Sequence, residues 1–89
     1  MTVQEAAERA TSYFQELLAG KITDIWLEEV ELVDGDPDVW RVTLSALAPG
    51  RVSQRGLAAL AGKDERIYRV FEIHDLTGRV LSMKIRTVQ

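Results

Sequence analysis

Residues 66–86 read RIYRVFEIHDLTGRVLSMKIR, two runs rich in β-branched and aromatic residues on either side of Asp-Leu-Thr-Gly. Runs of this composition are typical of strands, and the segment between them is typical of a tight turn. We therefore predict a β-hairpin with strands over 66–74 and 79–88. Apolar and polar residues alternate along the second strand, whereas the first is apolar on both faces. A strand of the latter kind is expected at the centre of a sheet or at an interface.

Two further strands are predicted upstream, over 22–33 and 39–47. The later one alternates apolar and polar residues, as a half-buried antiparallel strand does. In the earlier one the apolar residues change parity midway, and a strand can change faces only where a residue is inserted. We predict a β-bulge near Glu28-Glu29. The alternative is a second apolar layer, which would imply a partner on that face.

The N-terminal segment predicts an amphipathic helix over about residues 2–19. Thr2 followed three residues later by Glu5 is a capping-box pattern, and Gly20 suits the left-handed position after a helix. Apolar residues then recur at three- and four-residue spacing and form one face of the helix. Its members are Val3, Ala6, Ala7, Ala10, Tyr13, Phe14, Leu17 and Leu18.

The order of these elements predicts one α+β domain over 1–89. Strands joined by short turns pair antiparallel, so the N-terminal helix is expected to pack on a curled antiparallel sheet of three to four strands. The connection at 48–65 is long for so small a domain, and such loops are often functional. It carries Arg51 and Arg55, which we take as candidate contacts for a partner.

Composition narrows the chemistry. The 89 residues are 46% apolar and 28% charged, as in an ordinary folded globule, and include no cysteine and one histidine, His74. Disulfides, thiolate nucleophiles and multi-histidine metal sites are therefore excluded. The run Asp34-x-Asp36-x-Asp38 lacks the glycine and glutamate that a calcium loop requires, and we interpret it as an acidic turn. We expect no metal, no cofactor, no catalytic residues and no enzymatic activity.

Charge divides the chain in two. Residues 1–45 hold ten acids and three bases, whereas residues 46–89 hold eight bases and four acids. Either opposite charges pair across neighbouring strands, or the distribution orients a partner or a head-to-tail homo-oligomer. The sequence pI of about 5.1 argues against nucleic acid as a partner, because phosphate attraction dominates such binding.

The N-terminus shows no basic segment followed by an apolar one, so no export signal is predicted. Uninterrupted apolar runs are only a few residues long, so we expect no membrane span. The resulting expectation is a cytoplasmic protein.

Several short motifs give a family resemblance. A helix is followed by Gly-Lys-Ile-x-x-Ile, Trp-Arg-Val-x-Leu, Tyr-x-Val-x-Glu and Asp-x-Thr-Gly-x-Val-Leu. The order of these motifs along the chain resembles that of the PepSY-like families. The matching residues are Lys21, Ile22, Ile25, Trp40, Val42, Leu44, Tyr68, Val70, Asp75, Thr77, Gly78, Val80 and Leu81. The order of helix and strands, with a Trp-x-Val strand and an Arg-rich last strand, is also similar to that of the gas-vesicle accessory protein O family.

The resemblance implies a cystatin-like fold, with a helix cradled by an antiparallel sheet and no catalysis. PepSY domains are usually exported or membrane-linked, with inhibitory or regulatory roles, and residues 48–65 depart from both families.

Two hypotheses on function follow. The first is a small protein-interaction or regulatory domain that forms a homodimer or is a subunit of a larger assembly. Its candidate interface residues, chosen from the strands with two apolar faces and from the long loop, are Ile25, Trp26, Leu27, Tyr68, Phe71, Arg51 and Arg55. The second is a small-molecule or lipid carrier with a pocket between helix and sheet. Its candidate lining residues are Phe14, Leu17, Trp40 and Met83.

Overall fold

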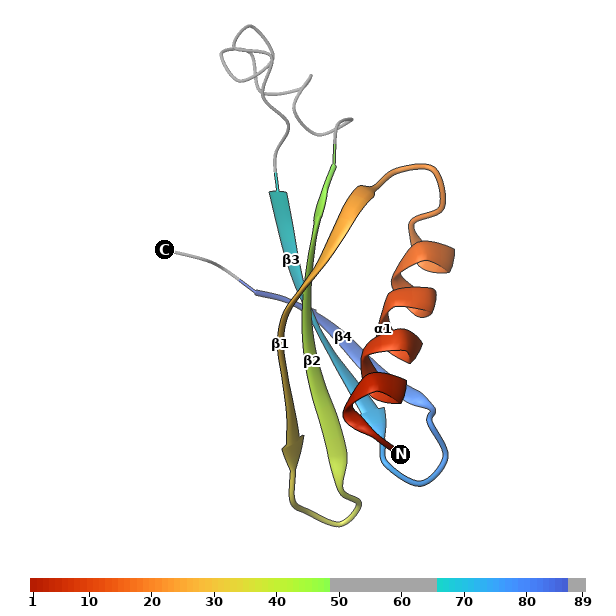
Figure 1. Cartoon of the computed structure of the whole chain (residues 1–89), viewed down its shortest axis with the longest axis vertical. Helices are drawn as coiled ribbons and strands as arrows, with labels where there is room; N and C mark the ends of the chain where they lie inside the picture. Colours follow the sequence, from red (N-terminus) through yellow and green to blue (C-terminus); the bar gives the residue numbers. More distant parts are fainter. Residues whose placement is uncertain (49–65, 87–89) are drawn as a thin grey trace, which may run out of the picture.

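A computed structural model of the chain describes residues 1–48 and 66–86, and Figure 1 shows one helix lying across a sheet. The elements are α1 (Val3–Leu17), β1 (Thr23–Val33), β2 (Val39–Leu47), β3 (Arg66–His74) and β4 (Val80–Ile85). The four strands form one antiparallel sheet in the order β1-β2-β3-β4. The α+β class and the helix-on-sheet arrangement predicted from the sequence are confirmed.

The helix begins as its sequence predicts. The Thr2 backbone N–H donates to Glu5 Oε1 at 2.9 Å, and the Glu5 N–H donates to Thr2 Oγ1 at 3.1 Å, which completes a capping box. The hydrogen bond from the Thr2 backbone lowers the pKa of the Glu5 carboxyl. The helix ends at Leu17, two residues earlier than predicted, and Gly20 follows in the left-handed region with φ of 75°.

The predicted bulge in β1 is present. The register against β2 shifts between Leu27 and Glu29, so Leu27 and Val30 point to the same face as their partners Leu44 and Val42. The parity change of the apolar residues in this strand therefore comes from an inserted residue. A second register shift lies nearer the start of β1, between Thr23 and Trp26.

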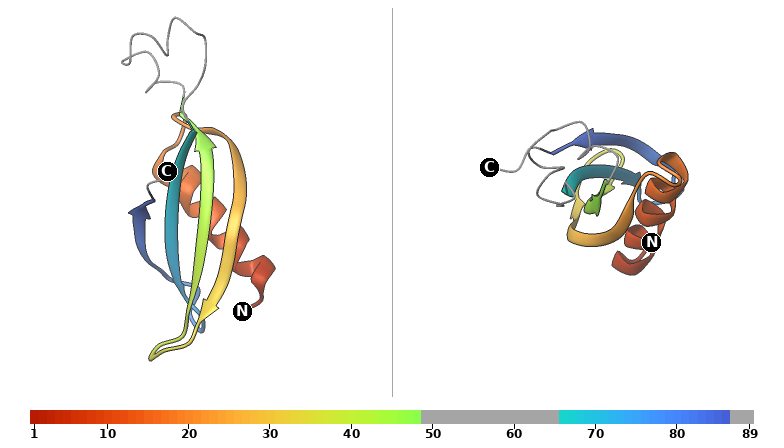
Figure 2. Two further views of the ribbon diagram at one scale, coloured as in Figure 1. Left: turned by 90° about the vertical axis from the view of Figure 1, so that its left-hand side faces the viewer. Right: turned by 90° about the horizontal axis from the view of Figure 1, so that it is seen from above.

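The core lies between α1 and one face of the sheet, which we call the helix face (Figure 2). Phe14 of α1 meets Phe71 of β3 edge to face, with ring centroids 5.3 Å apart, and both side chains are fully buried. Ala6 and Ala10, also fully buried, let the start of α1 approach the sheet closely. The other buried members are Trp40, Val42, Leu44, Ala46, Ala48, Ile67 and Ile73.

Strand β2 departs from its prediction as a half-buried strand. On the face away from α1, Thr43 is 1% exposed and Ser45 is fully buried, although no element of the described chain packs there as a second layer. Long side chains from the neighbouring strands form hydrogen bonds with Ser45, as described below. The last strand spans Val80–Ile85, so it begins one residue later than predicted and does not include Arg86, and the predicted residues 87–88 lie outside the described residues.

Within the described ranges, we find no helical segment that qualifies as a membrane span.

Candidate protein-interaction surfaces

The sheet face opposite α1 is defined by rows of residues in register across the strands, and we call it the charged face. Three rows belong to it: Glu31–Arg41–Glu72–Ser82, Glu29–Thr43–Val70–Lys84 and Trp26–Ser45–Tyr68. Acids lie mainly on β1, whereas bases lie on β2, β3 and β4. The unequal division of charge along the sequence therefore becomes a division of charge across the sheet.

Ion pairs join the two sets of charges. Arg41 contacts Glu31 at 3.3 Å and Glu72 at 3.2 Å, and its hydrogen bond to Glu72 raises the pKa of the guanidinium. Arg86, just after β4, lies 3.7 Å from Glu29 of β1. The latter pair joins β1 to the residue that directly follows β4. Opposite charges thus pair across the sheet, which was one of the two interpretations of the charge pattern.

Ser45 is the centre of a second network on this face. Its hydroxyl donates to Glu28 Oε2 at 2.7 Å and accepts a hydrogen bond from Arg66 Nε at 3.0 Å. Arg66 also donates from Nη2 to the Asp24 carbonyl at 2.7 Å. Glu28 and Arg66 therefore cover Ser45 and satisfy its hydrogen-bonding groups, as burial of a hydroxyl requires.

The same arginine holds Trp26 in place. The Arg66 guanidinium carbon lies 3.8 Å from the centroid of the Trp26 ring, and the indole Nε1 donates to Asp24 Oδ1 at 3.1 Å. Stacking of this kind is a cation–π interaction. Trp26 nevertheless remains 55% exposed. An exposed aromatic ring that is already fixed in one orientation loses little conformational freedom when it binds a partner.

Trp26 belongs to a strand that is open to solvent along most of its length. Within residues 1–48 and 66–86, no strand pairs with the outer side of β1. Leu27 is 50% exposed and Leu32 is 46% exposed on this strand. An uncovered edge with large apolar side chains is a template for pairing with another chain.

Strand β4 forms the opposite edge of the sheet. Leu81 is 45% exposed and Ile85 is 74% exposed. The second of these lies in register with Arg69, Leu44 and Leu27, so both ends of one row across the sheet carry an exposed aliphatic side chain. Figure 2 shows β1 and β4 as the two outer strands from both directions.

The predicted interface residues are distributed over three places. Trp26 and Tyr68 lie on the charged face, where both are in register with Ser45. Leu27 lies on the β1 edge but points to the helix face, and Ile25 packs against the core.

Phe71 requires a correction. It is fully buried against α1, because it points to the face opposite Tyr68, and it offers no surface to a partner. Arg51 and Arg55 lie outside the described residues.

The predicted pocket residues do not line a common cleft. Phe14 and Trp40 are buried members of the core, Met83 packs against it, and Leu17 is 46% exposed on the helix. None of the four lines either of two clefts on the described chain, one between α1 and the turn before β4 and one between the end of α1 and the start of β1. Helix and sheet are in direct contact through these side chains.

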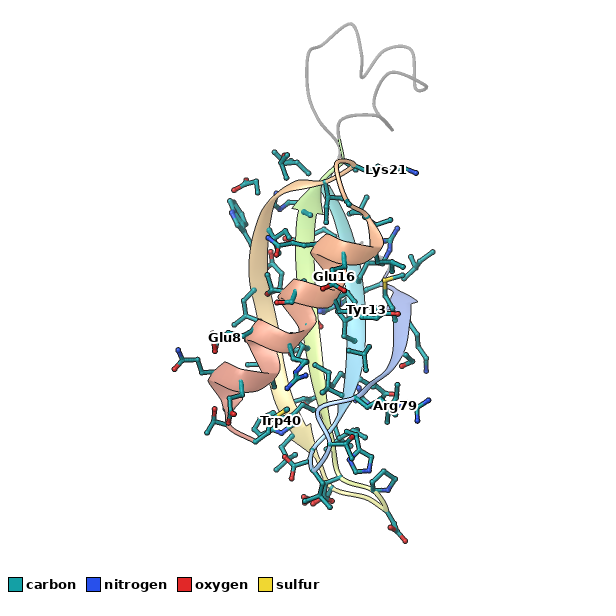
Figure 3. The ribbon with its side chains drawn as sticks, turned by 90° about the vertical axis from the view of Figure 1, so that its right-hand side faces the viewer. Glu8, Tyr13, Glu16, Lys21, Trp40 and Arg79 are labelled. Carbon is teal, nitrogen blue, oxygen red and sulfur yellow. The ribbon has the colours of Figure 1, made fainter. Side chains whose placement is uncertain are left out.

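The larger of those clefts has a volume of about 650 Å³ and lies between α1 and the turn before β4. Tyr13, Glu16 and Arg79 line this cleft, and Figure 3 shows the first two on the helix and Arg79 beyond the sheet edge. The other residues that line the cleft are Glu5, Glu8, Arg9, Ser12, Gly78 and Val80. The cleft is open to solvent and its lining is mixed in charge, and it lies beside Val80, which packs partly buried against the core.

The neighbouring side chains of His74 and Asp75 form hydrogen bonds with other groups and not with each other. The His74 Nδ1 accepts hydrogen bonds from the backbone N–H groups of Leu76 and Thr77, which closes the β3–β4 turn. Asp75 Oδ1 accepts from Trp40 Nε1 at 2.7 Å, and this hydrogen bond lowers the pKa of the carboxyl. The two neighbours therefore have separate structural partners.

The contact between Arg66 and Trp26 was missed by sequence reasoning. The two residues lie on strands that do not adjoin each other, and no local pattern links them. The unequal distribution of charge between the halves of the chain was the one signal that pointed to such long-range pairs. Comparisons with protein-family models, with curated proteins and with solved structures gave no match.

Proposed function

We propose that this chain is a non-enzymatic protein-binding domain whose contact surface is the outer edge of β1. The observation that carries the proposal is Trp26, which is 55% exposed and yet held by Arg66 and Asp24, beside an edge with which no other described strand pairs. Aromatic and arginine side chains supply much of the binding energy at protein interfaces. A role as a regulator or as a subunit of a larger assembly is consistent with such a surface.

The strand edge supports the same role. The backbone N–H and C=O groups on the outer side of an edge strand offer hydrogen bonds to an added strand, while exposed side chains provide specificity. β1 is 11 residues long. Leu27 lies next to its bulge and Leu32 lies in its regular part, and both provide exposed apolar surface on the helix face. A partner that adds a strand here would contact Leu27 and Leu32 on one face and Trp26 on the other.

Site-specific photo-crosslinking in the cells that express the chain tests this proposal. A photoreactive amino acid in place of Leu32 is expected to give a discrete protein adduct. The same group in place of Leu76, which is 88% exposed in the β3–β4 turn, is the matched control and is expected to give none. The yield of the adduct at position 32 should decrease several-fold when the Trp26→Ala substitution is added, because the Trp26 ring is part of the proposed contact. Equal labelling at positions 32 and 76 would contradict the proposal.

A further inference from the structure

We infer that the partner which pairs with β1 is the β4 edge of a second copy of this chain, in a head-to-tail arrangement that continues the sheet. This inference rests on the proposed function, since it uses the same β1 edge. It adds the identity of the partner and the register of the contact.

Strand direction permits the arrangement, with the second copy turned about the strand axis so that it follows the curl of the sheet. Each neighbouring pair in the sheet is antiparallel, so β1 and β4 run in opposite directions. A second copy in the same orientation therefore places its β1 antiparallel to the β4 of the first. Antiparallel pairing is the favourable geometry for a strand added at an edge.

Charge favours contact between β1 and β4 over contact between two β1 strands. β1 reads TDIWLEEVELV and carries four acids and no base. β4 reads VLSMKI, carries Lys84 and no acid, and lies between Arg79 and Arg86. Two β1 edges would bring acids together, and like charges directly opposite one another destabilise a strand pair. A β1 edge beside a β4 edge brings acids to bases.

The rows of the sheet specify matching side chains. When the sheet continues in register, the β4 member of each row meets the β1 member of the same row in the next copy. The resulting pairs are Ile85 with Leu27, Lys84 with Glu29, Met83 with Val30, Ser82 with Glu31 and Val80 with Leu32. Glu29 and Glu31 would keep their contacts to Arg86 and Arg41 of their own chain and share their carboxylates with the second copy. Three of these pairs are apolar, one is an ion pair and one joins a hydroxyl to a carboxylate. Such pairs stabilise neighbouring strands.

The contact is heterologous, because different edges of the two copies meet. A contact of this kind leaves one free β1 edge and one free β4 edge on every dimer, so it continues into longer chains or closes into a ring. The mass in solution is thus expected to rise above the 10.0 kDa of one chain as the concentration increases. Salt is expected to weaken the assembly through screening of the pair formed by Lys84 and Glu29.

Two edge variants of the purified full-length chain test the inference. Leu27→Lys with Leu32→Lys changes the β1 edge, and Lys84→Glu with Ile85→Glu changes the β4 edge. Leu27, Leu32 and Ile85 are all at least 46% exposed, so the fold should tolerate the changes, and circular dichroism checks that it does. Leu76→Lys is the control, because it introduces a lysine at an exposed position away from both edges.

Light scattering after gel filtration, from micromolar to hundreds of micromolar chain, gives the readout. The wild-type chain and Leu76→Lys should assemble. Each edge variant alone should assemble only at a protein concentration at least roughly ten-fold higher, which corresponds to a loss of about 1.4 kcal/mol of binding free energy per contact. An equimolar mixture of the two edge variants should assemble again, because it restores a normal β1 edge opposite a normal β4 edge.

Three results would overturn the inference. A wild-type chain that stays at 10.0 kDa at every concentration has no self-contact. A β4 variant that assembles like the wild type would show symmetric pairing of β1 edges. A mixture that fails to assemble would show that the two changes do not act on opposite sides of one contact. A discrete adduct with another protein at position 32, together with a monomeric purified chain, would leave the proposed function standing and remove this inference alone.

Discussion

The two faces of the sheet bury their residues by different means. On the helix face, α1 covers β2 and β3 with a packed layer that includes Phe14 and Phe71, both fully buried. On the charged face, Thr43 and Ser45 are buried although no second layer packs there within residues 1–48 and 66–86, and Glu28 and Arg66 form hydrogen bonds with Ser45. In the described part of the chain, both sides of a central strand are therefore buried with a helix on one side only. The comparison also predicts that the helix face determines stability and that the charged face determines local order around Trp26.

The largest effect is expected on the helix face. Phe14→Ala removes a fully buried ring that packs on Phe71, and the loss of its contacts together with the cavity should lower the free energy of unfolding by about 3–5 kcal/mol. Urea denaturation followed by circular dichroism measures this change. Leu17→Ala is the matched control, since Leu17 lies on the same helix at 46% exposure and its loss should cost much less. Equal effects of the two substitutions would contradict the assignment of the core.

A smaller effect is expected on the charged face. Ser45→Ala removes the hydroxyl between Glu28 and Arg66, and the loss should lower the free energy of unfolding by about 1–2 kcal/mol. Because Arg66 also stacks on Trp26, the fluorescence of the indole should shift toward that of a freely solvated ring. Ser82→Ala is the control, because its longer hydrogen bond to Glu72 lies far from Trp26 along the sheet. An unchanged emission spectrum in Ser45→Ala would show that the network does not fix the ring.

The smallest effect is expected at the β3–β4 turn and depends on pH. The hydrogen bond from Trp40 lowers the pKa of Asp75 below its ordinary value of 3.8 in the folded chain. A carboxyl with a lowered folded-state pKa stabilises the fold above its unfolded-state pKa, and this stabilisation is lost as the pH falls through the folded-state pKa. The wild type should therefore lose stability relative to Asp75→Asn in the acid range below about pH 4.

Denaturant midpoints of the two proteins between pH 7 and pH 2 measure this difference. The gap between the curves should be constant near neutrality and should narrow in acid. Parallel curves over the whole range would show that the interaction between Trp40 and Asp75 does not depend on the charge of the carboxyl.

Local patterns were sufficient to predict most of the fold. The strand over 39–47 and the strand over 66–74 have the predicted bounds, and the parity change at Glu28-Glu29 located a bulge. These features depend on neighbouring residues and on the period of two along a strand. The burial of Ser45 was not predicted, because it depends on Arg66 and Glu28, which reach it from two different strands.

The candidate interface was harder to predict for the same reason. Tyr68 and Phe71 were both chosen from a strand with two apolar faces, although an odd separation places them on opposite sides of the sheet. The sequence does not show which of those sides the helix covers. The edge positions of β1 and β4 likewise follow from the strand order, which long-range pairing determines.

Hydrogen–deuterium exchange tests whether β1 binds protein through its outer edge. Exchange of the backbone amides is compared at low and at high concentration of the chain. Amides of both β1 and β4 should become protected at high concentration, while those of α1 should exchange at an unchanged rate. Protection confined to β1 would contradict the head-to-tail contact and leave β1 as a symmetric interface. Protection of α1 with neither edge affected would contradict the assignment of the binding surface to β1.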